Sequence, residues 1–395
     1  MKAKPIKIFH SYPSWMLSGV CSWSMKMLDR LDSQEFDQKI LITGQPDTSG
    51  KYHLPPKDLP SINLQTPLKA SPRLYRKTLH SFLAREAPCV FLPNFDFDAA
   101  SLSGLLPKNV AICAGIRSDD PVYYRYAKTF GRYWDSAVAV SRHLYDTFGS
   151  CYPSLRDRLH YIPNGVEVSA APSQVEKNPA RIVYCNRIVE EQKRVFDVLA
   201  VANHLRDKNI SFEIDVLGSG PDEKRFEAQI VEQGLERFVR FKGQQTHAET
   251  LNALKSASYF ILPSEYEGMP NSLLEAMAAS AIPFTYDIPS GIPEIIEHGV
   301  NGYIFPVGST AELARKLGEH LIHPEMHQFL AKKAKAKIER FFSIEAMVEA
   351  YSSHFRSLGV MAKRSQCAQR DGRCRLLEKN SILKRVKRKL DQRLH

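Results

Sequence analysis

Two glutamates, Glu267 and Glu275, lie eight positions apart in the segment EYEGMPNSLLEAMA, which spans residues 265–278. The apolar run SYFILPS precedes the segment, and a glycine, a proline and an asparagine separate the two glutamates. This pattern predicts a buried strand, a turn and then a helix, with Glu267 just before the helix and Glu275 inside it. The unpaired N–H groups and the positive dipole end at the start of that helix would attract an anion.

The two carboxylates narrow the kind of ligand that this helix end could bind. They would repel a bare phosphate, so they are better explained as acceptors of hydrogen bonds from hydroxyl groups. A nucleotide sugar offers a diphosphate for the helix end and ribose and sugar hydroxyls for the carboxylates. An alternative needs no ligand: Ser272 and Glu275 match a capping box, and Glu267 is then a solvated loop residue.

Cations for a diphosphate are expected from the loop in RIVYCNRIVEEQKRV, which contains Arg187 and Lys193. Lys193 and Arg194 are predicted to begin a helix, KRVFDVLAVANHL, where the helix dipole disfavours positive charge. An anionic ligand would explain cations at that place, and ordinary surface charge is the alternative. We therefore expect replacement of Lys193 or Glu275 by Ala to weaken turnover of such a ligand and to leave the fold intact.

The elements that would position these residues alternate short apolar runs with longer amphipathic stretches, the pattern of parallel sheets covered by helices. Two such series occur, and the polar stretch VSAAPSQVEKNP separates them as a linker. The first has the predicted strands PIKIFH, QKILIT, CVFLPN, VAICAG, SAVAVS and LHYIPN, with helices over VCSWSMKMLDRL and RLYRKTLHSFLARE. The second has the predicted strands RIVYCN, FEIDVLG, VRFKG, SYFILPS, IPFTYD and GYIFP.

This organisation predicts an α/β fold with two Rossmann-like domains facing across a cleft. Ligands of such open sheets bind at the carboxyl ends of the strands, so the loops CNRIVEEQK, LGSGPDE, FKGQQ and PSEYEGMPN are expected to share that cleft. The predicted boundaries are residues 1–170 for the first domain, 171–340 for the second, 341–360 for a last helix and 361–395 for a tail.

Composition places the chain among globular proteins, because 395 residues with 43% hydrophobic content can fill two cores. No apolar run reaches the roughly 18 residues that a membrane-spanning helix needs. The N-terminus MKAKPIKIFHSYPSW lacks the apolar stretch of a signal peptide, so a cytosolic protein is expected. The seven cysteines form no CxxC pair, so neither a disulfide framework nor a zinc site is indicated.

The net charge of +11 is concentrated at the C-terminus. Residues 361–395 contain twelve Lys or Arg and three Asp or Glu, a net charge of +9, which leaves +2 for the preceding residues. Within this tail, SILKRVKRKLDQRLH spaces Ile382, Val386, Leu390 and Leu394 four positions apart, the pattern of a basic amphipathic helix on an anionic membrane surface. A solvated tail that adheres weakly to polyanions is the alternative.

The run PSEYEGMPNSLLEAMAASAIPFTYDIPSGIPEIIEHGVNGYIFPVGS, with its two glutamates, resembles the signature of retaining, family 4 (group 1) glycosyltransferases with the GT-B fold. The segment NRIVEEQKR resembles that family's Arg and Lys segment, LGSGPDEKRFE its glycine turn, FKG its base-contacting loop and IPNGVE its turn before the linker. The likeness covers most of residues 5–358, and its motifs are more specific in the second half than in the first.

The resemblance implies a role for each matching residue. Glu275 would hold the ribose hydroxyls of a nucleotide-sugar donor and Glu267 the transferred sugar, while Arg187 and Lys193 would neutralise the departing diphosphate. Whether Glu267 binds the sugar or attacks it stays open, and the family pattern favours binding. Further donor-binding residues would be Gly19, Gly218, Gly243, Gly268, Met269, Asn271, Ser272 and Leu273, with Gly243 beside the base, most often uracil in this family.

The implied activity is transfer of a sugar, with retention and without a metal or other cofactor, from a UDP-sugar to a glycan or lipid-linked acceptor. Bacterial surface polysaccharide or lipopolysaccharide assembly is the implied setting. The first domain would hold the acceptor and the second the donor. The helix over FFSIEAMVEAYSSHF would brace the first domain, and the basic tail would bring the enzyme to the inner face of the membrane.

The first half departs from the family pattern at two places. A single Gly19 after serine replaces the usual pair of glycines, and Arg117 stands where a histidine is common. An arginine stays protonated, so Arg117 would bind an anionic acceptor or the diphosphate, or pair with Asp119 or Asp120. His10 is a second acceptor-side candidate, with a satisfied core histidine as the alternative. Asp119 and Asp120 precede a proline, which indicates a helix start rather than a metal site.

Two other classes of protein remain possible from the sequence. A nucleotide-dependent oxidoreductase would carry GxGxxG after the first strand of a domain, which GSGPDE matches poorly. A nucleic-acid-binding protein would carry basic and aromatic residues together on its folded body, whereas here the charge lies in the tail. The charge distribution does allow a related alternative, a non-catalytic protein that binds polyanions through this tail.

Overall fold

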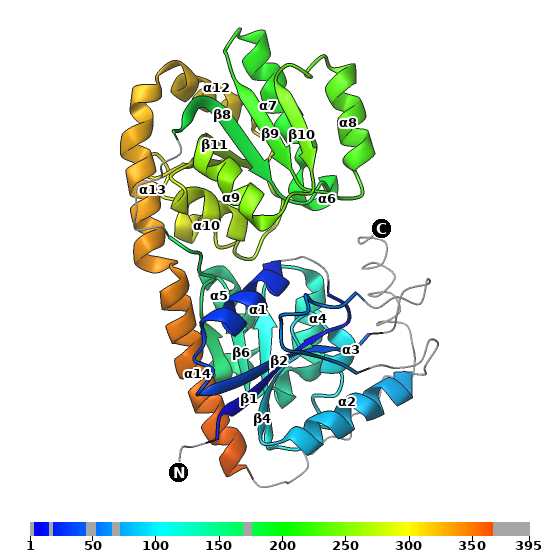
Figure 1. The fold of residues 1–395 in the computed structure, drawn as a ribbon. Helices are drawn as coiled ribbons and strands as arrows, with labels where there is room; N and C mark the ends of the chain where they lie inside the picture. Colours follow the sequence, from blue (N-terminus) through cyan, green and yellow to red (C-terminus); the bar gives the residue numbers. More distant parts are fainter. Residues whose placement is uncertain (1–3, 16–18, 45–52, 65–71, 169–175, 366–395) are drawn as a thin grey trace. The chain divides into compact units, whose positions relative to one another are not determined.

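The computed structural model describes residues 4–15, 19–44, 53–64, 72–168 and 176–365. Their contacts divide them into two compact units. Unit 1 contains the described residues up to Pro163 and those from Glu345 onward, and unit 2 is Asn164–Ile344 without the residues not described. Each unit has its own sheet and covering helices (Figure 1). The amphipathic helix predicted in the tail lies outside the described residues.

Unit 1 contains a seven-stranded parallel sheet with the strand order β3-β2-β1-β4-β5-β6-β7. Its strands are β1 (Ile6–Tyr12), β2 (Phe36–Ile42), β3 (Ser61–Asn63), β4 (Cys89–Leu92), β5 (Val110–Ile116), β6 (Ser136–Ala139) and β7 (Leu159–Tyr161). The six strands predicted for this half are present. Strand β3 was not predicted, because three residues at a sheet edge are too short to show a period of two.

Helices cover this sheet, and side-chain caps begin two of them. Asp120 accepts a hydrogen bond from the N–H of Val122, and Ser141 accepts one from the N–H of Leu144. Asp120 therefore begins a helix, as predicted. The helices of unit 1 are α1 (Gly19–Arg30), α2 (Pro72–Glu86), α3 (Phe97–Ala100), α4 (Pro121–Phe130), α5 (Arg142–Cys151) and α14 (Ile344–Arg364), with 3₁₀ turns η1 (Gly131–Tyr133) and η2 (Pro153–Arg158).

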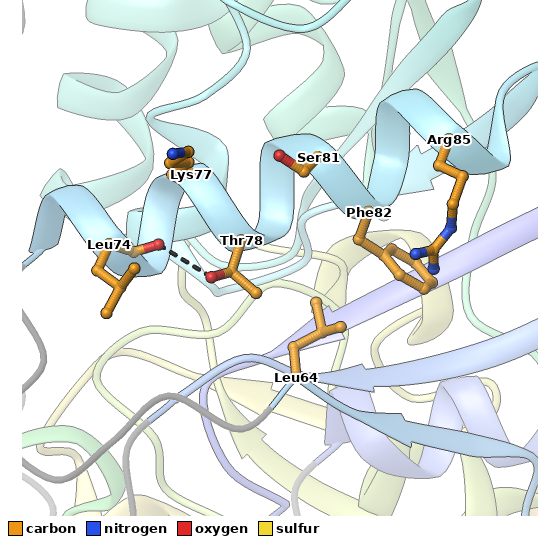
Figure 2. A pocket seen from close by; sticks show the side chains of 7 residues that line it. All are labelled: Leu64, Leu74, Lys77, Thr78, Ser81, Phe82 and Arg85. Carbon is orange, nitrogen blue, oxygen red and sulfur yellow. Dashed lines mark hydrogen bonds between the residues drawn. The ribbon is translucent and has the colours of Figure 1, made fainter.

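Helix α2 is an amphipathic helix that packs its apolar side against the sheet. Its residues Leu79, Phe82 and Leu83 are buried, which stabilises the unit by about 1.5–3 kcal/mol for each side chain. One side of this helix borders a cavity of about 400 Å³ (Figure 2). The residues that line this cavity are Leu64, Leu74, Lys77, Thr78, Ser81, Phe82 and Arg85.

Helix α14 packs against the rest of unit 1 through aromatic and charged contacts. The ring of Tyr351 lies 5.0 Å from that of Trp23, measured between centroids. Two guanidinium nitrogens of Arg356 lie 2.7 and 2.9 Å from the carboxylate oxygens of Glu35. The helix continues to Arg364, beyond the stretch expected from the sequence. Within the described residues, no helix combines the length and apolar content needed to cross a bilayer.

Unit 2 contains a six-stranded parallel sheet with the strand order β10-β9-β8-β11-β12-β13. Its strands are β8 (Asn178–Cys185), β9 (Glu213–Leu217), β10 (Val239–Gly243), β11 (Ala257–Leu262), β12 (Ile282–Tyr286) and β13 (Tyr303–Phe305). All six strands predicted for this half are present. The strand order 3-2-1-4-5-6 within the unit is that of a Rossmann fold, and it reverses direction between β8 and β11.

The helices of unit 2 agree with the predicted pattern except at one break. The stretch KRVFDVLAVANHL is not one helix, because Arg194 adopts a left-handed conformation with φ of 46° and separates α6 from α7. The helices are α6 (Glu190–Lys193), α7 (Val195–Asp207), α8 (Glu223–Glu232), α9 (His247–Ser256), α10 (Asn271–Ala278), α11 (Ile292–Ile295), α12 (Thr310–Ile322) and α13 (His327–Phe341), with a 3₁₀ turn η3 (Pro324–Met326).

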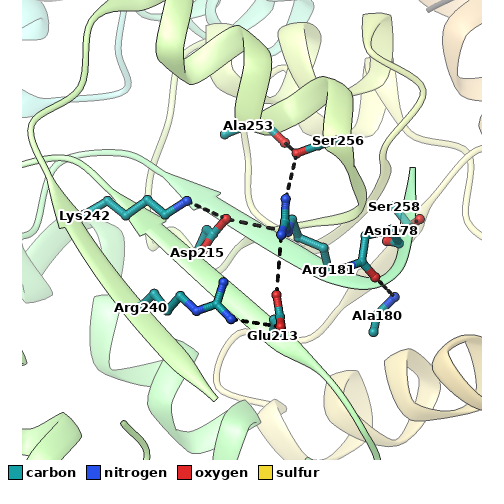
Figure 3. A network of polar contacts seen from close by, with 10 residues as sticks. All are labelled: Asn178, Ala180, Arg181, Glu213, Asp215, Arg240, Lys242, Ala253, Ser256 and Ser258. Carbon is teal, nitrogen blue, oxygen red and sulfur yellow. Dashed lines mark hydrogen bonds and ion pairs between the residues drawn. The ribbon is translucent and has the colours of Figure 1, made fainter. Parts of the chain in front are cut away.

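An ion network joins the three strands β8, β9 and β10 on one face of this sheet (Figure 3). The buried carboxylate of Asp215 lies 2.9 Å from Nζ of Lys242 and 3.8 Å from Nε of Arg181. Glu213 contacts Arg181 and Arg240 at 3.5 and 2.9 Å. Lys242 immediately precedes Gly243, so the network braces the strand that carries one of the predicted donor-binding loops.

Candidate functional site

The candidate site lies at the carboxyl edge of the unit 2 sheet, where the strand order reverses. Strands β8 and β11 are neighbours, with Tyr259 paired to Ile182 and Phe260 paired to Val183. The loops that follow these two strands therefore begin side by side. One carries Arg187 and Lys193, and the other leads through Glu267 into α10. Open parallel sheets bind ligands at such a reversal.

Direct hydrogen bonds connect the two loops. The N–H of Glu265 donates to the carbonyl of Gln192 at 2.8 Å, and the side-chain amide of Gln192 donates to the carbonyl of Tyr266 at 3.3 Å. Glu265 also accepts a bond of 3.1 Å from Arg194. The loops form one structural element, so residues of each are held at fixed distances from those of the other.

Lys193 and Glu267 form a buried ion pair at the centre of this element. Nζ of Lys193 lies 2.6 Å from Oε1 of Glu267, and the two side chains are 8% and 9% exposed. Ser264 donates a second hydrogen bond to Oε1 at 2.8 Å. From the described residues, Oε2 of Glu267 accepts no hydrogen bond. Glu267 is therefore not the solvated loop residue of the ligand-free alternative.

The position of Lys193 differs from the prediction. It is the last residue of the four-residue helix α6 and not the first turn of a long helix. A cation is favoured at a helix C-terminus, so the argument that the dipole disfavours Lys193 was wrong. The ion pair with the buried Glu267 explains why a lysine occupies position 193. Arg194, which follows, bonds Asp197 at 2.7 Å and so supports the left-handed turn.

Arg187 lies two residues beyond the end of β8 and is exposed. The hydroxyl of Tyr184 donates to the carbonyl of Arg187 at 2.9 Å and fixes the backbone there. Next to it, the side-chain amide of Asn186 donates to the hydroxyl of Ser272 on α10 at 3.0 Å. The loop that carries Arg187 is thus tied to the first turn of α10.

Helix α10 begins at Asn271 after Pro270, which provides no side-chain cap. Ser272 is the second residue of the helix, so the capping box of Ser272 and Glu275 is not formed. Glu275 is half-buried in the helix. The pKa of the Cys185 thiol is raised, mainly because the thiol is buried and also because the negative charge of Glu275 is near it. Glu275 therefore lies beside Cys185, the last residue of β8. Gly268, Met269 and Leu273 are buried.

Two glycines of the turn LGSGPDE allow the backbone to approach the loop after β8. Gly218 has φ of +136°, and a Cβ atom there would lie 1.9 Å from the carbonyl oxygen of Asn186. A Cβ atom on Gly220 would lie 2.2 Å from the carbonyl oxygen of Ile188. Gly243 has φ of +64° with open space around it, and its carbonyl accepts a 2.8 Å bond from the N–H of Gly218. The glycine turn and the predicted base loop are therefore adjacent.

Three residues that support the site were not predicted as part of it. The side-chain amide of Asn164 donates to the carbonyl of Met269 at 3.2 Å and to Oδ1 of Asn271 at 2.9 Å. The N–H of Gly291 donates to the carbonyl of Gly268 at 2.7 Å, and a Cβ there would lie 2.9 Å from Cε of Met269. Gly220 is the third. The quoted motifs IPNGVE, SGIPE and GSGPDE contain all three, but no local pattern shows what they contact.

Of the candidate residues in unit 1, Gly19 is exposed at the start of α1. His10 is fully buried, with Nδ1 2.9 Å from Ser24 Oγ and Nε2 3.2 Å from Gln38 Oε1. Burial lowers the pKa of His10 to about 3, so its ring is neutral. This is the satisfied core histidine of the alternative, and both ring nitrogens are already bonded inside the protein.

Arg117 follows β5 and is half-buried, with its guanidinium carbon 4.0 Å from the centroid of the Trp23 ring. It forms no ion pair with Asp119 or Asp120, so that alternative is not found. Asp119 instead contacts His143 at 3.0 Å and Tyr124 at 2.5 Å. In the part of the chain that the structure describes, no group of three or more His, Cys, Asp or Glu side chains is arranged to hold a metal ion.

The second half of the chain matches a known family. Residues 167–337 match the family model described as glycosyl transferases group 1. Among curated relatives, the lipopolysaccharide 1,6-galactosyltransferase of Escherichia coli K12 is 31% identical over 189 residues, which are 47% of this chain and 51% of that protein. The amylovoran biosynthesis glycosyltransferase AmsK of Erwinia amylovora is 33% identical over 172 residues, 41% of each chain. The match thus spans about half the length of these relatives or less.

Solved structures extend the likeness to the whole fold. The Anabaena protein Alr3699/HepE, solved in complex with UDP-glucose, superposes with a TM-score of 0.71 at 16% identity and covers 89% of this chain and 100% of that one. That protein shares the arrangement of two parallel sheets with covering helices. Residues 167–337 are thus similar to the glycosyl transferases group 1, and the chain has the two-domain GT-B fold.

Proposed function

We propose that the chain is a glycosyltransferase that moves a sugar from a UDP-sugar to a glycan or lipid-linked acceptor in bacterial surface polysaccharide or lipopolysaccharide assembly. The main support for this proposal is the position of Lys193, Glu267 and the first turn of α10. All three lie where the strand order of unit 2 reverses. The names of the relatives, in amylovoran and lipopolysaccharide synthesis, support the product class, and the UDP-glucose complex of HepE supports the donor class.

In this proposal the donor diphosphate lies against the first N–H groups of α10, where the helix dipole is positive. Arg187 reaches it from the loop after β8. Glu275 accepts hydrogen bonds from the ribose hydroxyls. Oε2 of Glu267 accepts one from the transferred sugar, since the other oxygen is already bonded to Lys193 and Ser264.

The chemistry of the proposal follows from charge. When the bond between the anomeric carbon and the diphosphate oxygen breaks, its electron pair leaves with the diphosphate and the sugar ring becomes positive. Arg187, Lys193 and the end of α10 stabilise the leaving group without a metal. The acceptor hydroxyl forms the new bond on the face that the diphosphate leaves, and its proton passes to the departing phosphate. The configuration of the sugar is then retained.

Glu267 has a binding role in this scheme and not a nucleophilic one. A carboxylate that is paired with an ammonium group at 2.6 Å is a weaker nucleophile than a free one. An oxidoreductase is less well supported, since the turn at Gly218 and Gly220 follows β9 and a dinucleotide fingerprint follows the first strand of its domain. The protein is proposed to work in the cytoplasm, with the tail at the membrane surface.

Donor specificity tests the proposal directly. Thermal shift with UDP-, GDP- and ADP-sugars should show stabilisation by one UDP-sugar, and incubation with that donor should release UDP slowly. NMR of the transferred or released sugar should show the anomeric configuration of the donor. Binding of NADH with no response to any nucleotide sugar would instead favour the oxidoreductase. A product with inverted configuration would exclude the same-face mechanism and leave the glycosyltransferase activity standing.

A further inference from the structure

Arg117 is a cation that the proposed donor site does not use. It follows the carboxyl end of β5, the edge where parallel sheets bind ligands. The chain makes room for it at Gly115, where a Cβ atom would lie 3.0 Å from Nε of Arg117. Its guanidinium carbon lies over the ring of Trp23, 4.0 Å from the centroid, and the ring of Tyr351 contacts Trp23 with 5.0 Å between centroids.

The groups around Arg117 leave its charge uncompensated. Its charge acts on His10, Tyr12, Cys113, Tyr123 and Tyr351, and all five are neutral near pH 7. Burial lowers the pKa of His10 to about 3 and raises the pKa of the Cys113 thiol to about 12. Among the described residues, no carboxylate lies within ion-pair distance of Arg117.

One nitrogen of Arg117 is also unsatisfied. Nε is buried and has no hydrogen-bond partner in the described residues. A partly buried charge without a counter-ion is unfavourable, and stacking on an aromatic ring offsets only part of the desolvation. The guanidinium carbon lies over the Trp23 ring, and the N–H groups of a guanidinium point outward within its own plane. Such an arrangement suits an anion that approaches edge-on.

We infer that Arg117 binds an anionic group, a carboxylate or a phosphate, on the sugar substrate held by unit 1. The inference rests on the proposed function and narrows its acceptor to an acidic glycan, such as one that contains a uronate or a sugar phosphate. A planar guanidinium binds either anion with two parallel hydrogen bonds. Because the neighbouring His10 is neutral, Arg117 is the residue of this cluster whose positive charge would bind an acidic sugar.

Matched pairs of sugars test this inference on the full chain. Glucuronate and glucose 6-phosphate are compared with glucose, and galacturonate and galactose 6-phosphate with galactose, as methyl glycosides in ligand-observed NMR titrations at low ionic strength. The acidic member of at least one pair should bind about 10- to 100-fold more tightly than the neutral one, the range expected for charge-assisted hydrogen bonds. The uronate and phosphate arms distinguish the two anions.

Variants of Arg117 test whether this residue causes the preference for acidic sugars. Arg117→Gln should abolish the acidic preference, and Arg117→Lys should retain part of it, because a lysine keeps the charge without the planar fork. Arg132→Gln is the matched control, since Arg132 also stacks on an aromatic ring, Tyr133 at 4.6 Å, but is exposed. It should leave the preference unchanged. The melting temperature of each variant shows whether it has folded.

Two results would overturn the inference: no preference for the acid in any pair, or a preference that survives in folded Arg117→Gln. UDP binding is measured on the same samples. If UDP binds and the acidic preference is absent, the inference fails while the proposed function stands. If UDP does not bind to the wild-type chain, the proposed function itself has failed.

Discussion

Nζ of Lys193 lies 2.6 Å from Oε1 of Glu267, and each side chain is less than a tenth exposed. The pair joins the loop after β8 to the loop after β11, and the hydrogen bonds of Gln192 with Glu265 and Tyr266 reinforce the same connection. A buried pair of this kind makes the two residues interdependent, because removing one leaves an unpaired charge inside the protein. The predicted site residues Lys193 and Glu267 therefore bear on stability as well as on donor binding.

Replacing Lys193 by Met should destabilise the fold by about 3–5 kcal/mol, because Glu267 would then be buried without its counter-ion. This differs from the expectation, based on an exposed first turn, that Lys193 can be replaced without effect on the fold. Urea unfolding followed by circular dichroism measures the change. The double variant Lys193→Met with Glu267→Gln should recover most of the stability and none of the turnover. Equal stability of single and double variants would show that the pair is not the cause.

Glu275→Gln should weaken UDP binding by about 10- to 100-fold, because a carboxylate that accepts bonds from the ribose hydroxyls is replaced by a neutral amide. Calorimetry with UDP and with 2′-deoxy-UDP shows whether the ribose is involved. The wild-type chain should prefer UDP, and Glu275→Gln should not distinguish the two. Glu227→Gln is the control, since Glu227 is exposed on α8. A variant that still prefers UDP would remove Glu275 from the ribose site.

Gly218→Ala should destabilise the protein by about 3 kcal/mol or more. The positive φ alone costs about 1–3 kcal/mol, and the new Cβ would meet the Asn186 carbonyl oxygen at 1.9 Å. Gly234→Ala is the matched control, because Gly234 has φ of +63° with nothing within 4 Å, and it should cost only about 1 kcal/mol. Chemical unfolding measures both. Similar losses in the two variants would mean that the approach to Asn186 is not required.

His10 should make the protein less stable as the pH falls below 6.5. Its pKa is lowered from 6.5 to about 3 in the folded state, so the unfolded chain binds the proton first and the stabilisation present above pH 6.5 is lost toward pH 3. From pH 7 to pH 5 the free energy of unfolding should decrease by about 2 kcal/mol on this account. Urea unfolding of the wild type and of His10→Gln checks it. The variant should show a smaller decrease, and identical pH profiles would contradict the assignment to His10.

Removal of residues 366–395 should reduce sedimentation with anionic vesicles and leave release of UDP from the donor unchanged. The cut is placed after α14, which ends at Arg364, so that helix stays intact. The attraction of basic residues to anionic lipid is electrostatic, so binding of the full chain should also fall as salt is added. Neutral vesicles are the control. Vesicle binding that is unaffected by the deletion would remove the membrane role of the tail.

The amino-acid sequence by itself determined the class of fold and the positions of most strands along the chain. Buried runs such as SYFILPS and the alternation with amphipathic stretches arise from local residue types, which is why both sheets were predicted and only the three-residue β3 was missed. The same local signals placed Glu267 before a helix and Glu275 within it. They also identified Asp120 as a helix start.

Tertiary structure decided which of these residues are joined. The break at Arg194, which puts Lys193 at the end of α6, depends on partners at Asp197 and Glu265, and no propensity of the local sequence shows them. The roles of Asn164 and Gly291 depend on contacts with residues distant in the chain. Burial removed His10 from the candidates and left Arg117 stacked on Trp23 without a counter-ion, because desolvation is a property of the packed fold and not of the residue type.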